Sequence, residues 1–525
     1  MPWPTHKEVN MLPIHPVDMS YFDALLLDIL DDQRNIQLAR RYHDGDQDVY
    51  LNSRVSEFLG MHSNNKFRMN VCRTVVSAVV DELDIVGFDT GEIADADGRK
   101  KQAEWAWNVW TENHMDAVQD EVHQAALRDR EAFVIVEWDA DRKRPVFTFN
   151  KRFVETAAGG DGEGCWMLYE NDDPNQRPLA AVKQWVEIYY DVNGFKRSRT
   201  RRNIYYPERV EKWVNDGQWR HYVEEGKPWP ITWKMGDGSP IGIPVIHFKN
   251  KDMRPEAWDA IPLQDAVNKL LVDVLAGSDM SAFRLLVAIG WYPTTDGKEP
   301  KADGSNLLKL APGQMIGTTK SKSEAGLEKI GGEDVTHLVN TLKDAILFAA
   351  QITDTPASRF ITTRQVAGNE TLKGQEKPLK KKAIDRRGLF GGPWAECMEM
   401  ARRLANLYDG AAMDEEIEFV ALWQTSEDMG ELEQKMKFGI PLETIWAEMG
   451  YTPLQIAAMK QSPEYKMRME KLLLEGAEAA VDASVPLETY LRRVGVDMTE
   501  IGKIGTEKLA EIATRQEDVT PPFPQ

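Results

Sequence analysis

IPLQDAVNKLLVDVL, residues 261–275, is the stretch of sequence that decides the fold. Its apolar residues recur every three or four positions, which predicts an amphipathic helix. The remaining positions form a polar face: Gln264, Asp265, Asn268, Lys269 and Asp273. The same period returns at Asp334, a residue type that caps helices well, and continues to Thr353. The sequence therefore predicts two helices of similar length, 261–286 and 334–353, that flank an insertion rich in Gly, Pro and Lys.

The pattern differs on the N-terminal side of these helices. Residues up to about 130 have mainly a helical period, with an exposed loop expected at 91–102. From 131 to 250, short β-branched and aromatic runs alternate with turn residues, which indicates antiparallel strands. Asn193-Gly194 lies between two aromatic runs and predicts a type I′ hairpin.

The C-terminal side is helical again. Residues 354–370 are polar and rich in helix breakers, so we expect a loop. A long helix with basic early turns follows from Thr371, and Gly391-Gly392-Pro393 predicts a bend or break in it. Residues 426–525 contain two similar helical units, which begin at Pro441 and Pro486. The whole pattern predicts an α+β, mainly helical, multi-domain chain.

The charge balance restricts the function. The chain has 64 Lys and Arg against 84 Asp and Glu, a net charge of -20. Proteins bind duplex DNA mainly through Lys and Arg side chains that neutralise phosphates, so the net negative charge disfavours a protein that binds DNA tightly. The same charge disfavours a protein that attaches to an anionic membrane surface. No apolar run approaches the roughly 18 residues of a membrane span, and no signal peptide is expected at the N-terminus. Three scattered cysteines indicate buried thiols in a reducing cytoplasm rather than disulfides.

No catalytic motif stands out in the sequence. A P-loop is absent, and the glycines of 160–164 lie between predicted strands, where a hairpin turn is favoured over a phosphate loop. Asp95-Ala-Asp97-Gly98 with Glu104 copies half of a calcium loop but lacks its first ligand, which favours an acidic surface turn. We expect no cofactor, no bound metal and no enzymatic activity.

The run Lys377–Arg387 is a concentration of positive charge in this acidic chain. Such a run is usually a solvated helix face or pairs with acidic neighbours. Contact with phosphate is the alternative.

The order of these parts resembles one family, the portal proteins of tailed double-stranded DNA bacteriophages, in particular siphophage-like ones. Six segments carry the resemblance: YHDGDQ (42–47), NVCRTVVSAVVDEL (70–83), GIPVIHFKN (242–250), IPLQDAVNKLLVDVL (261–275), TDTPASRF (353–360) and NETLKGQEKPLKKKA (369–383). Family members usually have Ser-Gly-x-Ala-Leu-Lys before the long helix, and this chain keeps only Leu372 and Lys373 of that pattern.

The resemblance implies a ring of about twelve subunits at one capsid vertex, with DNA passing along its axis during packaging and ejection. In such a ring the apolar stripes of the two helices would pack on neighbouring copies, leaving Asp265, Asp273 and Asp344 to solvent or the channel. An acidic channel would repel the DNA backbone rather than hold it. The implied divisions are a wing at 1–255, a first stem helix at 256–286, a clip at 287–333, a second stem helix at 334–353, a tunnel loop at 354–370, a long helix returning to the wing at 371–425, and a helical crown at 426–525.

Three groups of candidate site residues follow from this map. The stem group is Asp265, Lys269, Asp273, Lys343 and Asp344. The tunnel-loop group is Asp354, Arg359, Arg364, Asn369 and Glu370. The clip group, a locally basic docking surface, is Lys298, Lys301, Lys309, Lys320 and Lys322.

The expected partners are further copies of the chain, double-stranded DNA, the large terminase, head–tail connector proteins, and the major capsid and scaffold proteins, with no membrane. The expected location is the virion, after assembly in the host cytoplasm. Two other readings stay open, a metal-dependent nuclease or packaging-motor subunit and a soluble helical scaffold protein.

Overall fold

The computed structural model describes residues 33–48, 68–90, 96–154, 162–282, 285–290, 326–330, 335–360 and 369–424, apart from 171–172, 192, 225 and 237, together with scattered positions between 292 and 324. The described residues form a mixed helix-and-sheet fold, in agreement with the α+β prediction. The chain divides into two units. Unit 1 contains Met1–Gln37, Ser77–Glu256 and Leu379–Gln525, and unit 2 contains Leu38–Val76 and Ala257–Pro378. The predicted repeat units of 426–525 lie outside the described residues.

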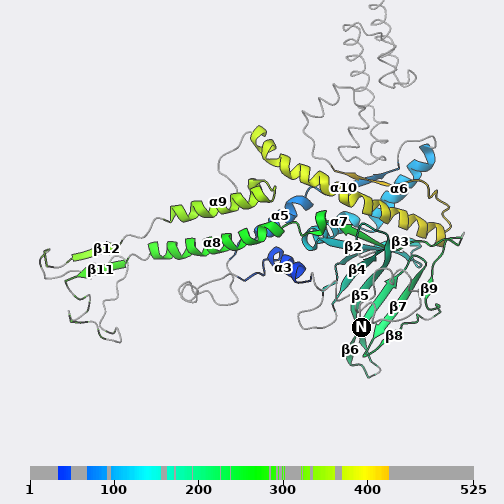
Figure 1. Cartoon of the computed structure of the whole chain (residues 1–525), viewed down its shortest axis with the longest axis horizontal. Coiled ribbons are helices and arrows are strands. Elements are labelled where there is room, and N and C mark those ends of the chain that lie inside the picture. The colour runs from blue at the N-terminus through cyan, green and yellow to red at the C-terminus, as the bar shows by residue number, and fades with distance from the viewer. Residues whose placement is uncertain are drawn as a thin grey trace, which may run out of the picture. The chain divides into compact units, whose positions relative to one another are not determined.

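Two antiparallel sheets make up the centre of unit 1 (Figure 1). The smaller sheet has the order β10-β2-β3, from Val245–Lys249, Glu131–Asp139 and Arg144–Lys151. The larger sheet runs β4 (Gly164–Tyr169), β5 (Pro178–Tyr190), β6 (Lys196–Tyr205), β7 (Arg209–Asn215) and β8 (Trp219–His221), with β9 (Ile231–Thr232) also on β7. This is the antiparallel pattern expected for residues 131–250.

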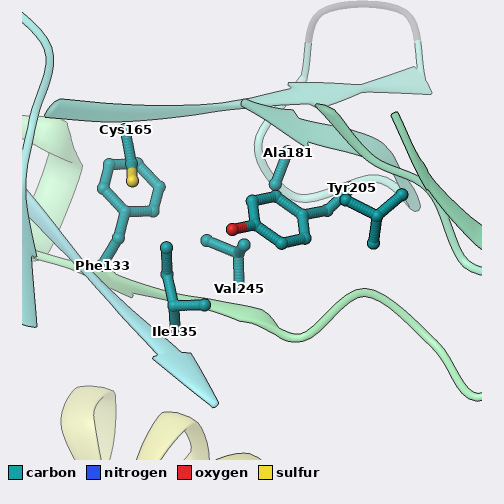
Figure 2. Packing of buried hydrophobic residues seen from close by; sticks show 7 residues of the cluster. Phe133, Ile135, Cys165, Ala181, Tyr205 and Val245 are labelled. Atoms are coloured by element: carbon teal, nitrogen blue, oxygen red, sulfur yellow. The ribbon is translucent and has the colours of Figure 1, made fainter. Parts of the chain in front are cut away.

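Alternate residues of these strands meet in a common core. Phe133 and Ile135 of β2 pack with Val245 of β10, and with Cys165, Ala181 and Tyr205 of the larger sheet (Figure 2). Because strand side chains alternate between faces, each strand supplies every second residue to this core.

Helices α6 (Ala96–Glu112) and α7 (Met115–Asp129) lie in unit 1, and α10 (Asn369–Tyr408) belongs to it from Leu379 onward. Strand β1 (Ile85–Asp89) pairs with β13 (Val420–Trp423). An aromatic cluster joins these elements, in which the rings of Trp110 and Trp394 lie 4.9 Å apart and Trp394 Nε1 donates to His123 Nε2 at 2.9 Å.

The predicted break at Gly391-Gly392-Pro393 is wrong, since α10 is one helix of 40 residues, and a bend there stays a prediction. Its buried face explains the continuity, because Phe390, Trp394, Cys397 and Ala401 recur at helical spacing and are buried. Tertiary packing of an apolar face outweighs the local propensity of glycine and proline.

The expected loop at 91–102 is also wrong from Ala96 onward, where α6 begins. Ala103, Ala106 and Trp110 are buried along one face, so packing fixes this helix. Asp97, Gly98 and Glu104 lie within α6, so these three of the residues compared with a calcium loop are helical rather than part of an acidic surface turn, while Asp95 lies outside the described residues.

The β5–β6 hairpin forms where Asn193-Gly194 predicted it, but its turn is not type I′. A type I′ turn centred on Asn193-Gly194 would be closed between residues 192 and 195, whereas here the Gly194 N–H donates to the carbonyl of Asp191 at 2.9 Å, a turn displaced by one residue. Asp191 shapes the loop instead: its carboxylate accepts from the N–H groups of Asn193 and Phe195, each at 2.9 Å. The bond from Phe195 N–H is the main cause that holds the pKa of Asp191 below its ordinary value.

Unit 2 is built on the helices α8 (Ile261–Ala282) and α9 (Thr336–Ile352). Between them, β11 (Leu285–Ile289) pairs antiparallel with β12 (Gly326–Ile330), so the first helix ends before the predicted residue 286 (Figure 1). Helices α3 (Gln33–His43) and α5 (Val71–Val80) each span residues of both units. Short 3-10 turns lie at Lys251–Met253, Trp258–Ala260 and Ala357–Arg359. Within the described ranges, no helix is long and apolar enough to cross a membrane.

Candidate functional site

The apolar stripes of α8 and α9 pack against each other. Val267 of α8 lies with Ile346 and Ala349 of α9 in a buried cluster that Val71 of α5 completes. At the far end of α8, a Cβ on Gly277 would lie 3.0 Å from Cγ1 of Val335, just before α9. The two contacts join opposite ends of the helices, so the helices are antiparallel. The two apolar stripes therefore pack on each other within one chain, and we call this contact between α8 and α9 the seam. The sequence had predicted instead that the stripes pack on neighbouring copies.

Gln264 ties α8 to the start of α5. Its Oε1 accepts from the N–H groups of Val71 and Cys72, the latter at 3.3 Å. Its Nε2 donates to the carbonyl of Met69 and, at 3.2 Å, to Oδ1 of Asn268. Gln264 and Asn268 are both buried. The N–H groups of a first helical turn have no partner within the helix, so Gln264 satisfies two that α5 would otherwise leave unpaired.

Asp265 makes a second link in unit 2. The Tyr42 hydroxyl donates to Oδ1 of Asp265 at 2.7 Å. Asn70 donates to the carbonyl of His43 at 2.6 Å and accepts from the N–H of Arg73 at 3.1 Å, which caps α5. Three of the segments that carry the family resemblance, 42–47, 70–83 and 261–275, therefore meet in one hydrogen-bonded joint.

The stem group of candidate residues does not form one site. Asp265 is half-buried at this joint instead of being left to solvent. Lys269 and Asp273 form an exposed ion pair at 3.4 Å on α8. Lys343 and Asp344 are exposed on α9.

Sequence reasoning placed Gln264 and Asn268 on a solvated polar face, and their linking role was missed. Their spacing of four residues beside the apolar stripe is the one sequence signal that could have suggested a buried polar pair.

A second apolar surface lies outside the seam. Leu347, Phe348 and Ile352 of α9 are 45%, 58% and 57% exposed. We call these three residues the outer apolar row. Residues four apart on a helix are neighbours on its surface, so Phe348 and Ile352 are adjacent exposed apolar side chains rather than isolated ones.

The expected tunnel loop is partly structured. Thr353 donates to the carbonyl of Ala349 at 2.7 Å, and Thr355 donates to the carbonyl of Thr353 at 3.2 Å, so the chain turns tightly after α9. Asp354 sits in this turn with φ 51°. Arg359 is exposed in the following 3-10 turn, and Arg364 lies outside the described residues. Asn369 and Glu370 begin α10, so the long helix starts two residues earlier than expected.

The clip group is described only in part. Lys298 and Lys301 are exposed, while Lys309, Lys320 and Lys322 lie outside the described residues. The carbonyl of Lys298 accepts from the Thr294 hydroxyl at 2.7 Å.

The basic run at the start of α10 divides into paired and exposed residues. Lys382 and Arg386 both bind the buried carboxylate of Glu256, each at 2.7 Å. Burial raises the pKa of Glu256, but the two cations outweigh burial and the pKa lies below its ordinary value. Lys377 and Lys381, four residues apart on the same helix, are exposed. Pairing with an acidic neighbour is thus confirmed for part of the run.

Two kinds of reactive group can be located in the described residues, possible metal ligands and cysteine thiols. In the part of the chain that the structure describes, no cluster of three or more His, Cys, Asp or Glu side chains could hold a metal ion. Cys72, Cys165 and Cys397 are free and buried, as expected. Burial, with a smaller effect of Asp265, raises the pKa of Cys72 to about 12.

Comparison with known proteins relates this chain to the portal proteins of phages. Residues 28–448 match the family described as "Phage portal protein, SPP1 Gp6-like". The portal protein of Mycobacterium phage D29 is 21% identical over 442 residues, which cover 79% of this chain and 82% of that protein. The portal protein of Mycobacterium phage L5 is 20% identical over 440 residues, with the same coverage of both chains.

Two solved structures from gene transfer agent particles are also similar. A chain from the neck of an empty particle has a TM-score of 0.37 and 12% identity, covering 76% of this chain and 94% of that one. A chain from the virion of a native particle has a TM-score of 0.34 and 10% identity, covering 72% and 89%.

The family model and both mycobacteriophage relatives place this mixed helix-and-sheet chain among the structural proteins of phage particles. The chain belongs to the SPP1 Gp6-like family of phage portal proteins. The general role of that family is to provide the channel for DNA at the phage head, and the family is structural rather than enzymatic.

Proposed function

We propose that about twelve copies of this chain form a ring whose outer contact includes the outer apolar row of α9. The carrying observation is that Leu347, Phe348 and Ile352 stay exposed although the seam between α8 and α9 is already closed within the chain. Burying such a side chain contributes about 1.5–3 kcal/mol, and a ring gives every copy the same contact.

In the proposed ring, each part of the chain corresponds to one region of a portal subunit. Residues 1–255 form the wing, α8 and α9 the stem, 287–333 the clip, 354–370 the tunnel loop and 426–525 the crown. The continuous helix α10 supports this map, because an unbroken rod of 40 residues can join the end of the tunnel loop to unit 1.

DNA would pass through the ring without being gripped. A net charge of -20 on each copy repels a phosphate backbone, and part of the basic run is neutralised by Glu256. The exposed Lys377 and Lys381 and the exposed Arg359 are the proposed sites of transient phosphate contact. Weak, salt-sensitive contacts suit a conduit, because strong contacts would stall the moving DNA.

The clip is the proposed docking surface for the large terminase and then for the head–tail connector proteins. Lys298 and Lys301 are exposed there, and Lys309, Lys320 and Lys322 add to its positive charge. The proposed ring also contacts the major capsid and scaffold proteins at the capsid vertex.

The outer apolar row can be tested by replacing Phe348 with Asp. A buried, unpaired carboxylate is costly, so we expect the variant to remain folded but to lose ring assembly in analytical ultracentrifugation. Asn340→Asp is the matched control, because it places the same charge on an exposed position of α9. Assembly of the Phe348 variant at wild-type concentration would reject the proposed contact.

A further inference from the structure

The outer half of strand β5 has a neighbouring strand on one side only. β5 pairs with β6 along residues 181–190, whereas its pairing with β4 ends at Gln184 (Figure 1). In the described part of the chain, residues 186–190 therefore form a strand edge that no second strand covers. We call residues 186–190 the β5 edge.

The turn of the hairpin shows which way the backbone groups of the β5 edge point. The Asp191 N–H donates to the carbonyl of Phe195 at 3.0 Å, toward β6. Hydrogen bonds of an antiparallel strand alternate between its two sides, so the even-numbered residues of the β5 edge direct their N–H and C=O groups away from β6. The Val186 N–H agrees, because it donates at 3.4 Å to the carboxylate of Glu163, just before β4. The β5 edge thus offers donors and acceptors at the spacing of an antiparallel strand.

The two edges of the hairpin differ in their protection. β7 pairs with β6 only from Thr200 onward, so within the described ranges residues 196–199 also lack a second neighbouring strand. Three of those four residues are Lys or Arg, and charged side chains of this kind keep strand edges from pairing. The β5 edge contains no Lys or Pro, its register with β6 is continuous, and Ile188 and Tyr190 are 57% and 72% exposed. The chain thus protects one edge of the hairpin and leaves the other open.

We infer that the β5 edge binds the same edge of a second copy of the chain as an antiparallel strand. An antiparallel edge is complementary to its own copy through a two-fold axis. With the axis at Ile188, this residue faces its counterpart. Val186 then faces Tyr190, a β-branched residue against an aromatic one, which is a favourable cross-strand pair. Glu187 faces Tyr189, so no like charges are opposed.

The opposite face of the β5 edge permits this pairing. Glu187 already pairs with Arg199 and Arg201 within the hairpin, so its charge remains compensated when a second strand lies beside it. The contact is separate from the proposed ring contact on α9. Neighbours in a ring are related by the ring axis, whereas the β5 contact needs a two-fold axis, so it joins two single copies or two whole rings.

The test replaces Ile188 by Pro. The Ile188 N–H points away from β6, so proline removes a donor of the open edge without removing a bond of the hairpin. Ser198→Pro is the matched control, because Ser198 lies opposite Ile188 and its N–H points out of the protected edge of β6. Both changes are made in the Phe348→Asp chain, which lacks the proposed ring contact. Thermal unfolding followed by circular dichroism checks folding, and sedimentation velocity over a range of concentrations measures self-association.

We expect the Phe348→Asp chain to form dimers. Adding Ser198→Pro should leave the dissociation constant unchanged, and adding Ile188→Pro should raise it about tenfold or more. A Phe348→Asp chain that is monomeric at every concentration would overturn the inference, as would equal association of the two proline variants. If Ile188→Pro does not fold, Ile188→Lys with Ser198→Lys as control gives the same comparison, because Ile188→Lys puts like charges opposite each other at the two-fold axis.

Failure of the proposed ring contact can be told apart from failure of the β5 contact. If the Phe348→Asp chain still forms rings, the α9 contact is rejected and the β5 edge is examined by electron microscopy. Pairs of stacked rings that persist with Ser198→Pro and separate with Ile188→Pro would support the inference. Single rings in both variants and in the parent chain would overturn it.

Discussion

Gln264 on α8 accepts a hydrogen bond from the N–H of Val71, which lies 193 residues earlier at the start of α5. The same side chain donates to the carbonyl of Met69. A single buried amide thus holds together two distant segments of unit 2, which is why the helix pair can be positioned by residues from near the N-terminus.

Replacement of Gln264 by Leu should destabilise the chain by about 1–3 kcal/mol, because the N–H groups of Val71 and Cys72 would be left buried without acceptors. Urea unfolding followed by circular dichroism measures this change. Gln375→Leu, at an exposed position of α10, is the control and should have little effect. A Gln264 variant as stable as the control would show that the joint is dispensable.

Glu256→Gln should destabilise the chain by about 3–5 kcal/mol, because Lys382 and Arg386 would lose their shared counter-charge in a buried setting. Asp385→Asn, which removes an exposed carboxylate on the same helix, should cost much less. The free energies of unfolding of the two variants in urea are compared. A larger loss for Glu256→Gln than for Asp385→Asn shows that the buried ion pairs, and not the net charge near α10, stabilise the chain.

Because of the Glu256 carboxylate, we expect the stability of the folded chain to fall at acidic pH. The pKa of Glu256 is lower in the folded chain than its ordinary value of 4.5, so its contribution to stability is present above that value and is lost as pH falls through the folded pKa. Urea midpoints measured from pH 6 downward should fall more steeply for the wild type than for Glu256→Gln. Parallel curves would contradict this linkage.

Because of His123, we expect a second change of folding stability with pH, in a higher pH range than that of Glu256. Burial lowers the pKa of His123 to about 3, from an ordinary value of 6.5. Below 6.5 the unfolded chain takes up a proton that the folded chain excludes, so stability should fall by up to about 1.4 kcal/mol per pH unit. His123→Gln keeps an acceptor for Trp394 and should reduce this slope, whereas the exposed His337→Gln should not. Thermal unfolding between pH 7 and 5 provides the comparison.

The three cysteines should be unreactive in the folded chain. All are buried, and burial is the main cause that raises the pKa of Cys72 and of Cys165 to about 12, so little thiolate is present at pH 8. Iodoacetamide followed by mass spectrometry should show no alkylation in native buffer and three modified cysteines in urea. Rapid native alkylation would mean that these sites open to solvent.

The sequence predicted elements better than contacts. The periods of 261–275 and 334–353 are strong, and α8 and α9 lie within a few residues of the expected bounds. The joint made by Gln264 was missed because a polar residue beside an apolar stripe looks the same whether it is solvated or buried. Which of the two holds depends on Val71, a partner that local periodicity does not identify.

Local rules failed where packing opposed them. Gly391-Gly392-Pro393 carries the usual signals of a helix end, yet Phe390 and Trp394 are fully buried and keep α10 continuous. The early basic run of α10 could be assigned to pairing or to solvent only once Glu256 was found beside Lys382 and Arg386. Of the candidate groups, the tunnel-loop and clip residues remain predictions from the family resemblance.

Electron microscopy of the purified full-length chain tests the central claim most directly. The account predicts closed rings with a central hole, built from about twelve copies. Compact particles of one or two copies, at concentrations where the chain is folded, would contradict it.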